Sequence, residues 1–200
     1  MITAININES DLWENFLKGN DESLEKIYRV YFDDLYAYGN KLFDDKAFSE
    51  DVIQDLFVKL IQRRENLSPT TSIKFYLFRS FKSIAFDKLK VSKRYKLTVV
   101  EENNSFPVEV NPENQLIEKE DDQEISVKLN AAIQALTPRQ REAIFLKYSE
   151  GFSYPEITSM LDLTPKATYK LMARAIDALK DHVGIMVQFI FSIKILIANF

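Results

Sequence analysis

The stretch of sequence that decides the fold comprises residues 137–180, TPRQREAIFLKYSEGFSYPEITSMLDLTPKATYKLMARAIDALK. It contains three helix-start signals in succession, each a hydroxyl residue closely followed by proline: Thr137-Pro138, Ser153-Tyr154-Pro155 and Thr164-Pro165. A Ser or Thr at the N-cap and a proline in the first turn are both typical of helix N-termini. Gln140 and Glu156, three residues after the first two hydroxyls, complete capping boxes. The stretch therefore predicts three successive helices.

The last two predicted helices have the proportions of a helix-turn-helix. A short helix, Tyr154 to Leu161, is followed by a tight connection at Asp162-Leu163 and by a longer helix that ends near Asp181. In this motif the second helix enters the major groove of DNA. Its apolar stripe comprises Thr168, Leu171, Met172, Ala175, Ile176 and Leu179. Its outer face has Lys166, Tyr169, Lys170, Ala173, Arg174 and Asp177. This basic, tyrosine-bearing face suits phosphates and base edges, although a solvated helix in a bundle would show the same pattern.

The composition of the whole chain excludes several classes of protein. Only 4 Gly and 6 Pro occur in 200 residues, which predicts an all-α fold because sandwiches and barrels use many such turn residues. The chain has no cysteine, and one histidine, His182, cannot build a metal site alone. Without a Gly-rich phosphate loop or a zinc-binding histidine pair, we expect no enzymatic activity, no cofactor and no metal.

The N-terminal half shows three further helical patterns. Apolar residues recur at helical spacing from Leu24 to Leu42. A second helix is predicted to begin near Ser49, taken as its N-cap, and a third to run from about Ser72 to Lys90. Its expected core residues are Leu77, Phe78, Phe81, Ile84, Ala85 and Leu89. Residues 74–96 hold eight Lys or Arg against one acidic residue, Asp87.

An acidic segment follows this basic stretch. Residues 101–124 hold nine Asp or Glu against one lysine, together with two prolines. Such a segment is expected to bury little and to act as a linker between two helical domains.

Two distant blocks of the sequence resemble the extracytoplasmic-function group of the sigma-70 family. The block from Leu136-Thr137-Pro138-Arg139-Gln140 through Arg174-Ala175 resembles the fourth region of sigma factors. Ser49-Glu50-Asp51-Val52-Ile53-Gln54-Asp55-Leu56-Phe57, with the basic-aromatic helix that ends at Asp87-Lys88-Leu89-Lys90, resembles their second region. The acidic segment occupies the place where this group lacks a folded third region.

The resemblance implies a domain organisation and a function. We expect a region 2 domain at residues 1–97, an acidic linker at 98–125, a region 4 helix-turn-helix domain at 126–183 and an apolar tail at 184–200. The implied function is that of an RNA polymerase sigma factor that directs promoter-specific initiation. The implied partners are core RNA polymerase, promoter DNA and an anti-sigma factor, with no small-molecule substrate.

The resemblance also implies three binding sites. The polar face with Asp51, Gln54 and Asp55 would bind the clamp helices of core polymerase, although it could also be a simple solvated face. The minus-ten element would be bound by Phe75, Arg79, Lys82, Ser83, Phe86, Asp87, Lys90, Lys93 and Arg94, because rings and cations suit unstacked bases. The minus-thirty-five element would be bound by Ser153, Thr164, Lys166, Tyr169, Lys170 and Arg174. Ser83 and Lys90 depart from the asparagine and arginine that are usual in relatives.

Several alternatives remain open at this point. A stand-alone helix-turn-helix regulator would not bind polymerase, and a helical adaptor would not bind DNA. Residues 1–13 show no secretory signal, so a cytoplasmic location is expected. The apolar residues 185–200 fall short of the ~20 that span a bilayer. They could pack on the fourth-region domain, contact an anti-sigma factor or another protein, or associate weakly with a membrane.

Overall fold

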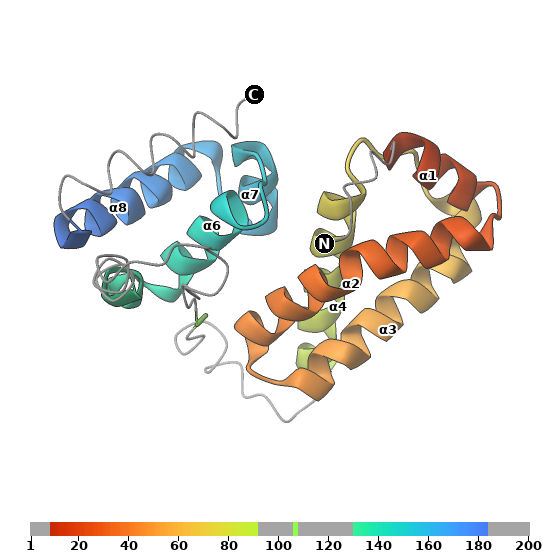
Figure 1. Ribbon diagram of the computed structural model, residues 1–200, viewed down its shortest axis with the longest axis horizontal. Helices are drawn as coiled ribbons and strands as arrows, with labels where there is room; N and C mark the ends of the chain where they lie inside the picture. Colours follow the sequence, from red (N-terminus) through yellow and green to blue (C-terminus); the bar gives the residue numbers. More distant parts are fainter. Residues whose placement is uncertain (1–8, 92–105, 108–129, 184–200) are drawn as a thin grey trace, which may run out of the picture. The chain divides into compact units, whose positions relative to one another are not determined.

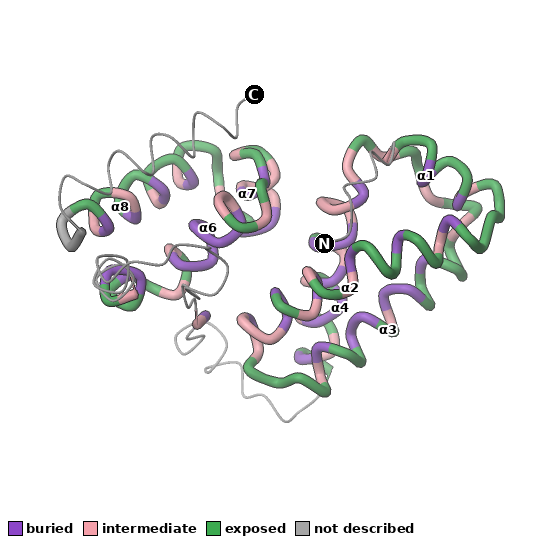
Figure 2. The backbone as a smooth tube through the Cα atoms, viewed as in Figure 1, coloured by how far each residue is buried: buried purple, intermediate pink, exposed green. Residues whose placement is uncertain are grey.

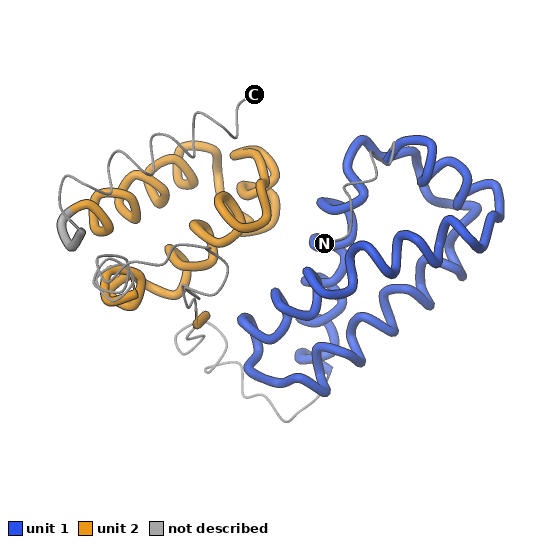
Figure 3. Tube along the Cα trace, viewed as in Figure 1, with its two compact units in different colours: residues 1–104 blue, residues 105–200 orange. Residues whose placement is uncertain are grey.

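The computed structural model describes residues 9–91, 106–107 and 130–183 (Figure 1). Within these ranges all regular secondary structure is helical, which confirms the predicted all-α fold. The chain divides into two compact units, residues 1–104 and 105–200 (Figure 3). No helix in the described ranges is long and apolar enough to span a membrane. The tail at 184–200, Lys93, Arg94 and most of the acidic segment lie outside the described residues, as does the side chain of His182.

The first unit is built around three long helices. Its elements are α1 (Glu9–Leu17), α2 (Asp21–Phe43), α3 (Lys46–Arg63), the short 3-10 helix η1 (Arg64–Asn66) and α4 (Ile73–Val91). The helices α2, α3 and α4 pack against one another, and α1 packs against α2. Their buried residues form the core between the helices, while the outer sides are exposed (Figure 2). All the core residues predicted for α4 are buried, from Leu77 to Leu89.

The start of α3 differs from the prediction. Asp45 is the N-cap, and its carboxylate accepts a hydrogen bond from the Phe48 backbone N–H at 2.9 Å. Ser49 lies inside the helix, is fully buried, and donates its hydroxyl hydrogen to the Asp45 carbonyl at 2.8 Å. The prediction of Ser49 as the N-cap is therefore wrong. Asp45 caps the helix one turn earlier because the chain needs a small buried side chain at Ser49, where α2 approaches α3.

Gly39 makes this close approach of helices possible. A Cβ atom added at Gly39 would lie 2.7 Å from Cζ of Phe81 in α4 and 2.8 Å from Oγ of Ser49 in α3. Both distances are shorter than ordinary van der Waals contacts. The three helices of the first unit therefore meet at a position where only glycine fits without a shift.

The helix α1 is held to the unit by polar contacts as well as by burial. The Glu9 carboxylate accepts hydrogen bonds from the Tyr31 hydroxyl at 2.8 Å and from the Ile73 backbone N–H at 2.9 Å. The second bond places a negative charge at the N-terminus of α4, where the helix dipole favours it. The fully buried Trp13 donates from its indole nitrogen to the Ser68 carbonyl at 3.0 Å.

The second unit contains the three helices that the opening stretch predicts. After a helical segment at residues 130–135 come α6 (Pro138–Tyr148), α7 (Tyr154–Met160) and α8 (Pro165–Val183). Thr137 and Gln140 form one capping box, and Ser153 and Glu156 form another. The predicted starts of all three helices are confirmed because their signals are local to the chain.

Phe106 corrects the expectation that the acidic segment buries little. Its side chain is only 1% exposed, and its ring lies edge-on to that of Phe145, with 5.6 Å between the ring centroids. The residue adopts a positive φ of 33°, an uncommon conformation for a residue other than glycine. Burial of a large aromatic ring outweighs this strain, so Phe106 belongs to the core of the second unit although it lies within the acidic segment.

Candidate functional sites

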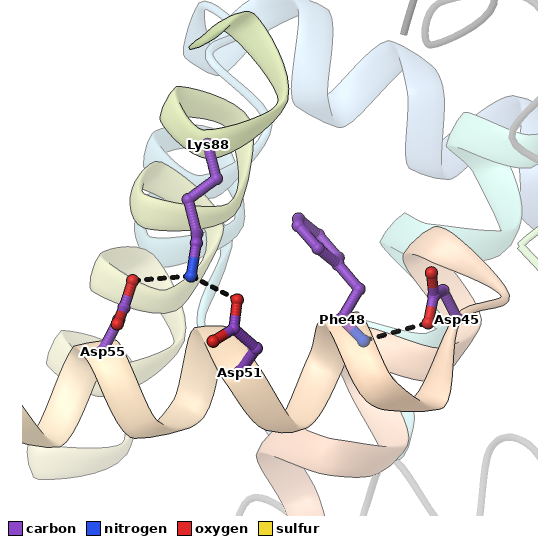
Figure 4. A network of polar contacts seen from close by, with 5 residues as sticks. All are labelled: Asp45, Phe48, Asp51, Asp55 and Lys88. Carbon is purple, nitrogen blue, oxygen red and sulfur yellow. Dashed lines mark hydrogen bonds and ion pairs between the residues drawn. The ribbon is translucent and has the colours of Figure 1, made fainter. Parts of the chain in front are cut away.

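The first candidate site is the acidic face of α3. Asp51 and Gln54 are exposed and Asp55 is half-buried, and the spacing of the three residues places them on one side of the helix. Lys88 reaches this face from α4 (Figure 4). Its ammonium group forms ion pairs with both carboxylates, at 2.7 Å from Oδ2 of Asp55 and in close contact with Oδ2 of Asp51. The structure therefore brings together two predicted site residues and a third residue that was not predicted.

The two carboxylates determine the charge state of Lys88. Burial lowers the pKa of Lys88, but the hydrogen bonds and charges of Asp51 and Asp55 together raise the pKa above its ordinary value. The ammonium stays protonated at neutral pH and offsets one of the two negative charges. The Asp51 and Asp55 side chains nevertheless remain 57% and 42% exposed, so a cationic partner could still reach them.

The outer face of α4 is the second candidate site. Arg79, Ser83, Asp87 and Lys90 are exposed, and Phe75, Lys82 and Phe86 are half-buried. The Lys82 ammonium lies 6.0 Å from the centroid of the Phe86 ring, and the Lys90 ammonium lies 3.7 Å from Asp87. Phe78 and Phe81 are fully buried, as expected for core residues. The face thus combines exposed cations with two half-buried aromatic side chains, Phe75 and Phe86.

The helix-turn-helix of the second unit is held by contacts between its helices. The Arg139 guanidinium in α6 donates to the Leu161 carbonyl at the C-terminus of α7, at 2.6 Å. Asp162 follows with a φ of 49°, which is the tight connection expected between the helices. The hydroxyl oxygens of Thr158 in α7 and Thr168 in α8 lie 2.9 Å apart and are hydrogen-bonded. These contacts fix the angle and the register of α8 relative to α7.

The third candidate site is the outer face of α8. Lys166, Tyr169, Lys170 and Arg174 are exposed. Thr168, Met172, Ala175 and Leu179 are buried, and Leu171 and Ile176 are half-buried, which confirms the predicted division of the helix into two faces. The hydroxyl of Thr164 accepts a hydrogen bond from the Ala167 backbone N–H at 3.2 Å, and Ser153 forms its capping box. Both of these predicted DNA-binding hydroxyls therefore also serve as helix caps.

Two residues beside α8 were missed by the sequence analysis. The ring of Tyr154, at the start of α7, stacks on the ring of Tyr169 with 4.7 Å between centroids and 16° between planes. The Lys147 ammonium lies 5.5 Å from the centroid of the Tyr154 ring. Burial, and to a smaller extent Tyr169, raises the pKa of Tyr154, so its hydroxyl stays neutral at physiological pH. No local sequence signal marks these contacts, because they join separate helices.

Family comparisons agree with this geometry. Residues 27–95 match the model for sigma-70 region 2, and residues 126–179 match the model for sigma-70, region 4. The chain belongs to the sigma-70 family. The acidic face of α3 and the basic-aromatic face of α4 lie in region 2 of this sigma factor, and the helix-turn-helix lies in region 4.

Several curated relatives of this sigma factor are named RNA polymerase sigma factors, and SigX is named as one of the ECF group. The chain is 23% identical over 171 residues to RNA polymerase sigma factor CarQ of Myxococcus xanthus. The aligned residues make up 86% of this chain and 95% of CarQ. The chain is 20% identical over 171 residues to ECF RNA polymerase sigma factor SigX of Bacillus subtilis. The aligned residues make up 83% of this chain and 86% of SigX. The solved structure of CnrH in complex with the cytosolic domain of CnrY shares the fold, with a TM-score of 0.54 and 19% sequence identity. The match covers 88% of this chain and 96% of the solved chain.

These matches confirm the resemblance to extracytoplasmic-function sigma factors and the predicted function of an RNA polymerase sigma factor. Sigma factors are known as non-enzymatic transcription initiation factors. Among the residues that the structure describes, no group of three or more His, Cys, Asp or Glu side chains could hold a metal ion.

Proposed function

We propose that this sigma factor uses region 2 to bind both core RNA polymerase and the minus-ten element, and region 4 to bind the minus-thirty-five element. One observation carries the proposal: an acidic face on α3 and a basic-aromatic face on α4 occur in one unit, and a helix-turn-helix with a cationic outer face occurs in the other. A stand-alone regulator would need only the helix-turn-helix.

Core polymerase would bind Asp51, Gln54 and Asp55. Exposed carboxylates beside an amide offer acceptors to a basic partner helix, which sets orientation and association rate as well as affinity. Lys88 already pairs with both carboxylates, so a cation of the partner would either replace the Lys88 ammonium or bind the carboxylate oxygens that it leaves exposed.

The minus-ten element would bind along α4 in its strand-separated form. Unstacked bases gain from aromatic rings, at about 1–3 kcal/mol per base, and the bare phosphate chain gains from cations. Phe75 and Phe86 expose part of their rings, and Arg79 and Lys90 are exposed beside them. Ser83, Lys82 and Asp87 complete the proposed surface, and Lys93 and Arg94 would extend it beyond the described residues.

The minus-thirty-five element would bind the N-terminal half of α8. Lys166, Tyr169 and Lys170 are exposed near the helix N-terminus, where backbone N–H groups also favour phosphate. Arg174 lies farther along and would contact the DNA backbone rather than the bases. Ser153 and Thr164 would contribute phosphate contacts from the two helix caps.

Further partners and boundaries follow from the same proposal. CnrH, which shares the fold, is solved with the cytosolic domain of CnrY, and we expect an anti-sigma factor for this chain too. Residues 98–125 would link the two regions, and the chain would act in the cytoplasm, where polymerase and promoters are found.

A charge-reversal experiment tests the polymerase-binding site. The double variant Asp51→Lys/Asp55→Lys should bind core polymerase roughly 1000-fold more weakly than the wild type, because each of the two lost charge pairs costs about 2 kcal/mol. Its matched control is Asp33→Lys/Glu65→Lys, which makes the same change in net charge at two exposed residues outside α3. Equal core affinity in the two double variants would contradict the assignment. Sequence-specific duplex binding with no polymerase affinity in the wild type would instead favour a stand-alone regulator.

A further inference from the structure

The stacked pair of tyrosines beside α8 is the feature from which we draw a further inference. Tyr169 is 58% exposed, yet one face of its ring is covered by the nearly parallel ring of Tyr154. The Tyr154 ring in turn has the Lys147 ammonium 5.5 Å from its centroid. Three helices, α6, α7 and α8, therefore each contribute one side chain to this cluster.

A second contact beside the stack limits movement between α7 and α8. Thr158 follows Tyr154 by one helical turn in α7, and Thr168 directly precedes Tyr169 in α8. The Thr168 hydroxyl donates to the Thr164 carbonyl and accepts from the Thr158 hydroxyl, whose oxygen lies 2.9 Å away and whose single proton is shared with the Tyr154 carbonyl. The helix that carries Tyr169 is thus fixed to the helix that carries Tyr154.

These contacts hold the Tyr169 ring in one orientation before any ligand binds. A tyrosine has few rotatable bonds, and stacking removes most of the freedom that remains. A side chain that is already ordered loses little entropy on binding, so its contacts contribute more to affinity and to discrimination. Lys166 and Lys170, which flank Tyr169 on the exposed side of α8, make no ring contact or ion pair with the described residues.

The chemistry of the ring indicates what it would recognise. In the major groove, thymine differs from cytosine and uracil by presenting a 5-methyl group, and an apolar side-chain surface is the natural contact for that methyl. The exposed part of the Tyr169 ring provides such a surface on the outer face of α8. A flexible lysine head group provides none.

We propose that Tyr169 determines specificity by contacting a thymine methyl in the upstream promoter element, and that Tyr154 is the positioning residue that holds its ring in place. The inference rests on the proposed function, since it assumes that α8 binds this element. It names thymine as a base that the proposed site recognises. It also assigns a role to Tyr154 of α7, which was not predicted to be part of the site.

The test uses the full-length chain bound to core polymerase and one promoter from which this holoenzyme initiates. Each thymine of the upstream element is replaced in turn by deoxyuridine, which removes only the methyl group, and holoenzyme affinity for the duplex is measured. For the wild type we expect one or two positions at which the replacement weakens binding roughly fourfold. This ratio corresponds to the free energy of burying one methyl group. The absence of any such position would overturn the proposal.

Four variants then separate the two tyrosines and their chemical groups. Tyr169→Ser, which removes the apolar surface, and Tyr154→Leu, which removes the stacked ring, should both bind thymine and deoxyuridine duplexes equally at that position. Tyr169→Phe and Tyr154→Phe, which keep the rings, should retain the fourfold ratio. Lys166→Ala is the matched control, because loss of a phosphate contact should weaken both duplexes alike. A ratio that stays fourfold in Tyr154→Leu would refute the positioning role.

Failure of the inference can be distinguished from failure of the proposed function. If the wild-type holoenzyme initiates at promoters but ignores the thymine methyl, only the inference falls. If the chain confers no promoter-dependent initiation at all, the proposed function falls with it. Thermal unfolding by circular dichroism should be the same for Tyr154→Leu and Tyr154→Phe within a few degrees, since a purely structural effect would separate these variants.

Discussion

Replacement of Gly39 by alanine tests the packing that forms region 2. The added Cβ would lie 2.7 Å from Cζ of Phe81, 2.8 Å from Oγ of Ser49 and 3.0 Å from Cβ of Ser49. Relief of these contacts requires α2, α3 or α4 to shift, and overpacking of this kind costs about 1–3 kcal/mol. Alanine is favoured over glycine within a helix by up to about 1 kcal/mol, which offsets part of the cost. We therefore expect the variant to be less stable than the wild type by up to about 2 kcal/mol.

A control in the same helix separates the two contributions. Ala37 is exposed in α2, so Ala37→Gly measures the difference in helix propensity without a steric term. The free energy of unfolding is measured by denaturant titration of the full chain. Trp13 is the single tryptophan of the chain and is fully buried in the first unit, so its fluorescence reports the unfolding of that unit. If Gly39→Ala stabilises the unit by as much as Ala37→Gly destabilises it, the steric cost is zero and the reasoning is refuted.

Three further variants test single contacts. Lys88→Met should raise the affinity for core polymerase, because Asp51 and Asp55 lose their internal partner and become available to a cation of the polymerase. A lower affinity in a folded variant would mean that Lys88 itself contacts polymerase. Phe106→Ala should destabilise the second unit by about 3–5 kcal/mol, because it removes a large buried ring. Helical circular dichroism should then be lost at lower denaturant concentration, while the unfolding transition seen by Trp13 fluorescence is unchanged. A circular dichroism transition at the wild-type concentration would show that the buried ring contributes nothing. Burial, together with Glu9 and Asp34, raises the pKa of Tyr31 above its ordinary value of 10.0, so the folded state favours the neutral phenol. The stability that the neutral phenol contributes is complete below the pKa of the unfolded chain and is lost as the pH rises through the pKa of the folded state. Tyr31→Phe should therefore lose less stability than the wild type in alkali, and identical pH profiles would contradict the effect.

The parts of the fold that depend on neighbouring residues were predictable from the sequence. Thr137, Ser153 and Thr164 begin helices through hydrogen bonds to backbone groups three residues away, so the signal and its consequence lie in the same short segment. The division of α8 into a buried and an exposed face follows from helical spacing alone. These features hold whichever surface the helix packs against.

The features that depend on packing between helices were not predictable. Asp45 and Ser49 are equally good N-caps by composition, and the choice between them depends on Gly39 and Phe81, which lie elsewhere in the sequence. Phe106 lies in a segment rich in acidic residues and shows no helical apolar spacing, so its burial is seen only in its contact with Phe145.

The candidate sites show the same limit. The sequence identified Asp51 and Asp55 as a polar face, but their ion pairs with Lys88 require α4 to pack beside α3. Tyr154 was recognised only as part of a helix start, and its stack on Tyr169 requires the turn between α7 and α8 to bring the two rings together.

Start-site mapping with purified components tests the central claim most directly. Core polymerase is mixed with the full-length chain, and transcripts from a genomic promoter library are sequenced from their first nucleotide. We predict starts at a limited set of promoters that share an upstream and a downstream sequence element, with no such starts from core polymerase alone. Starts that are indifferent to the presence of the chain would contradict the account.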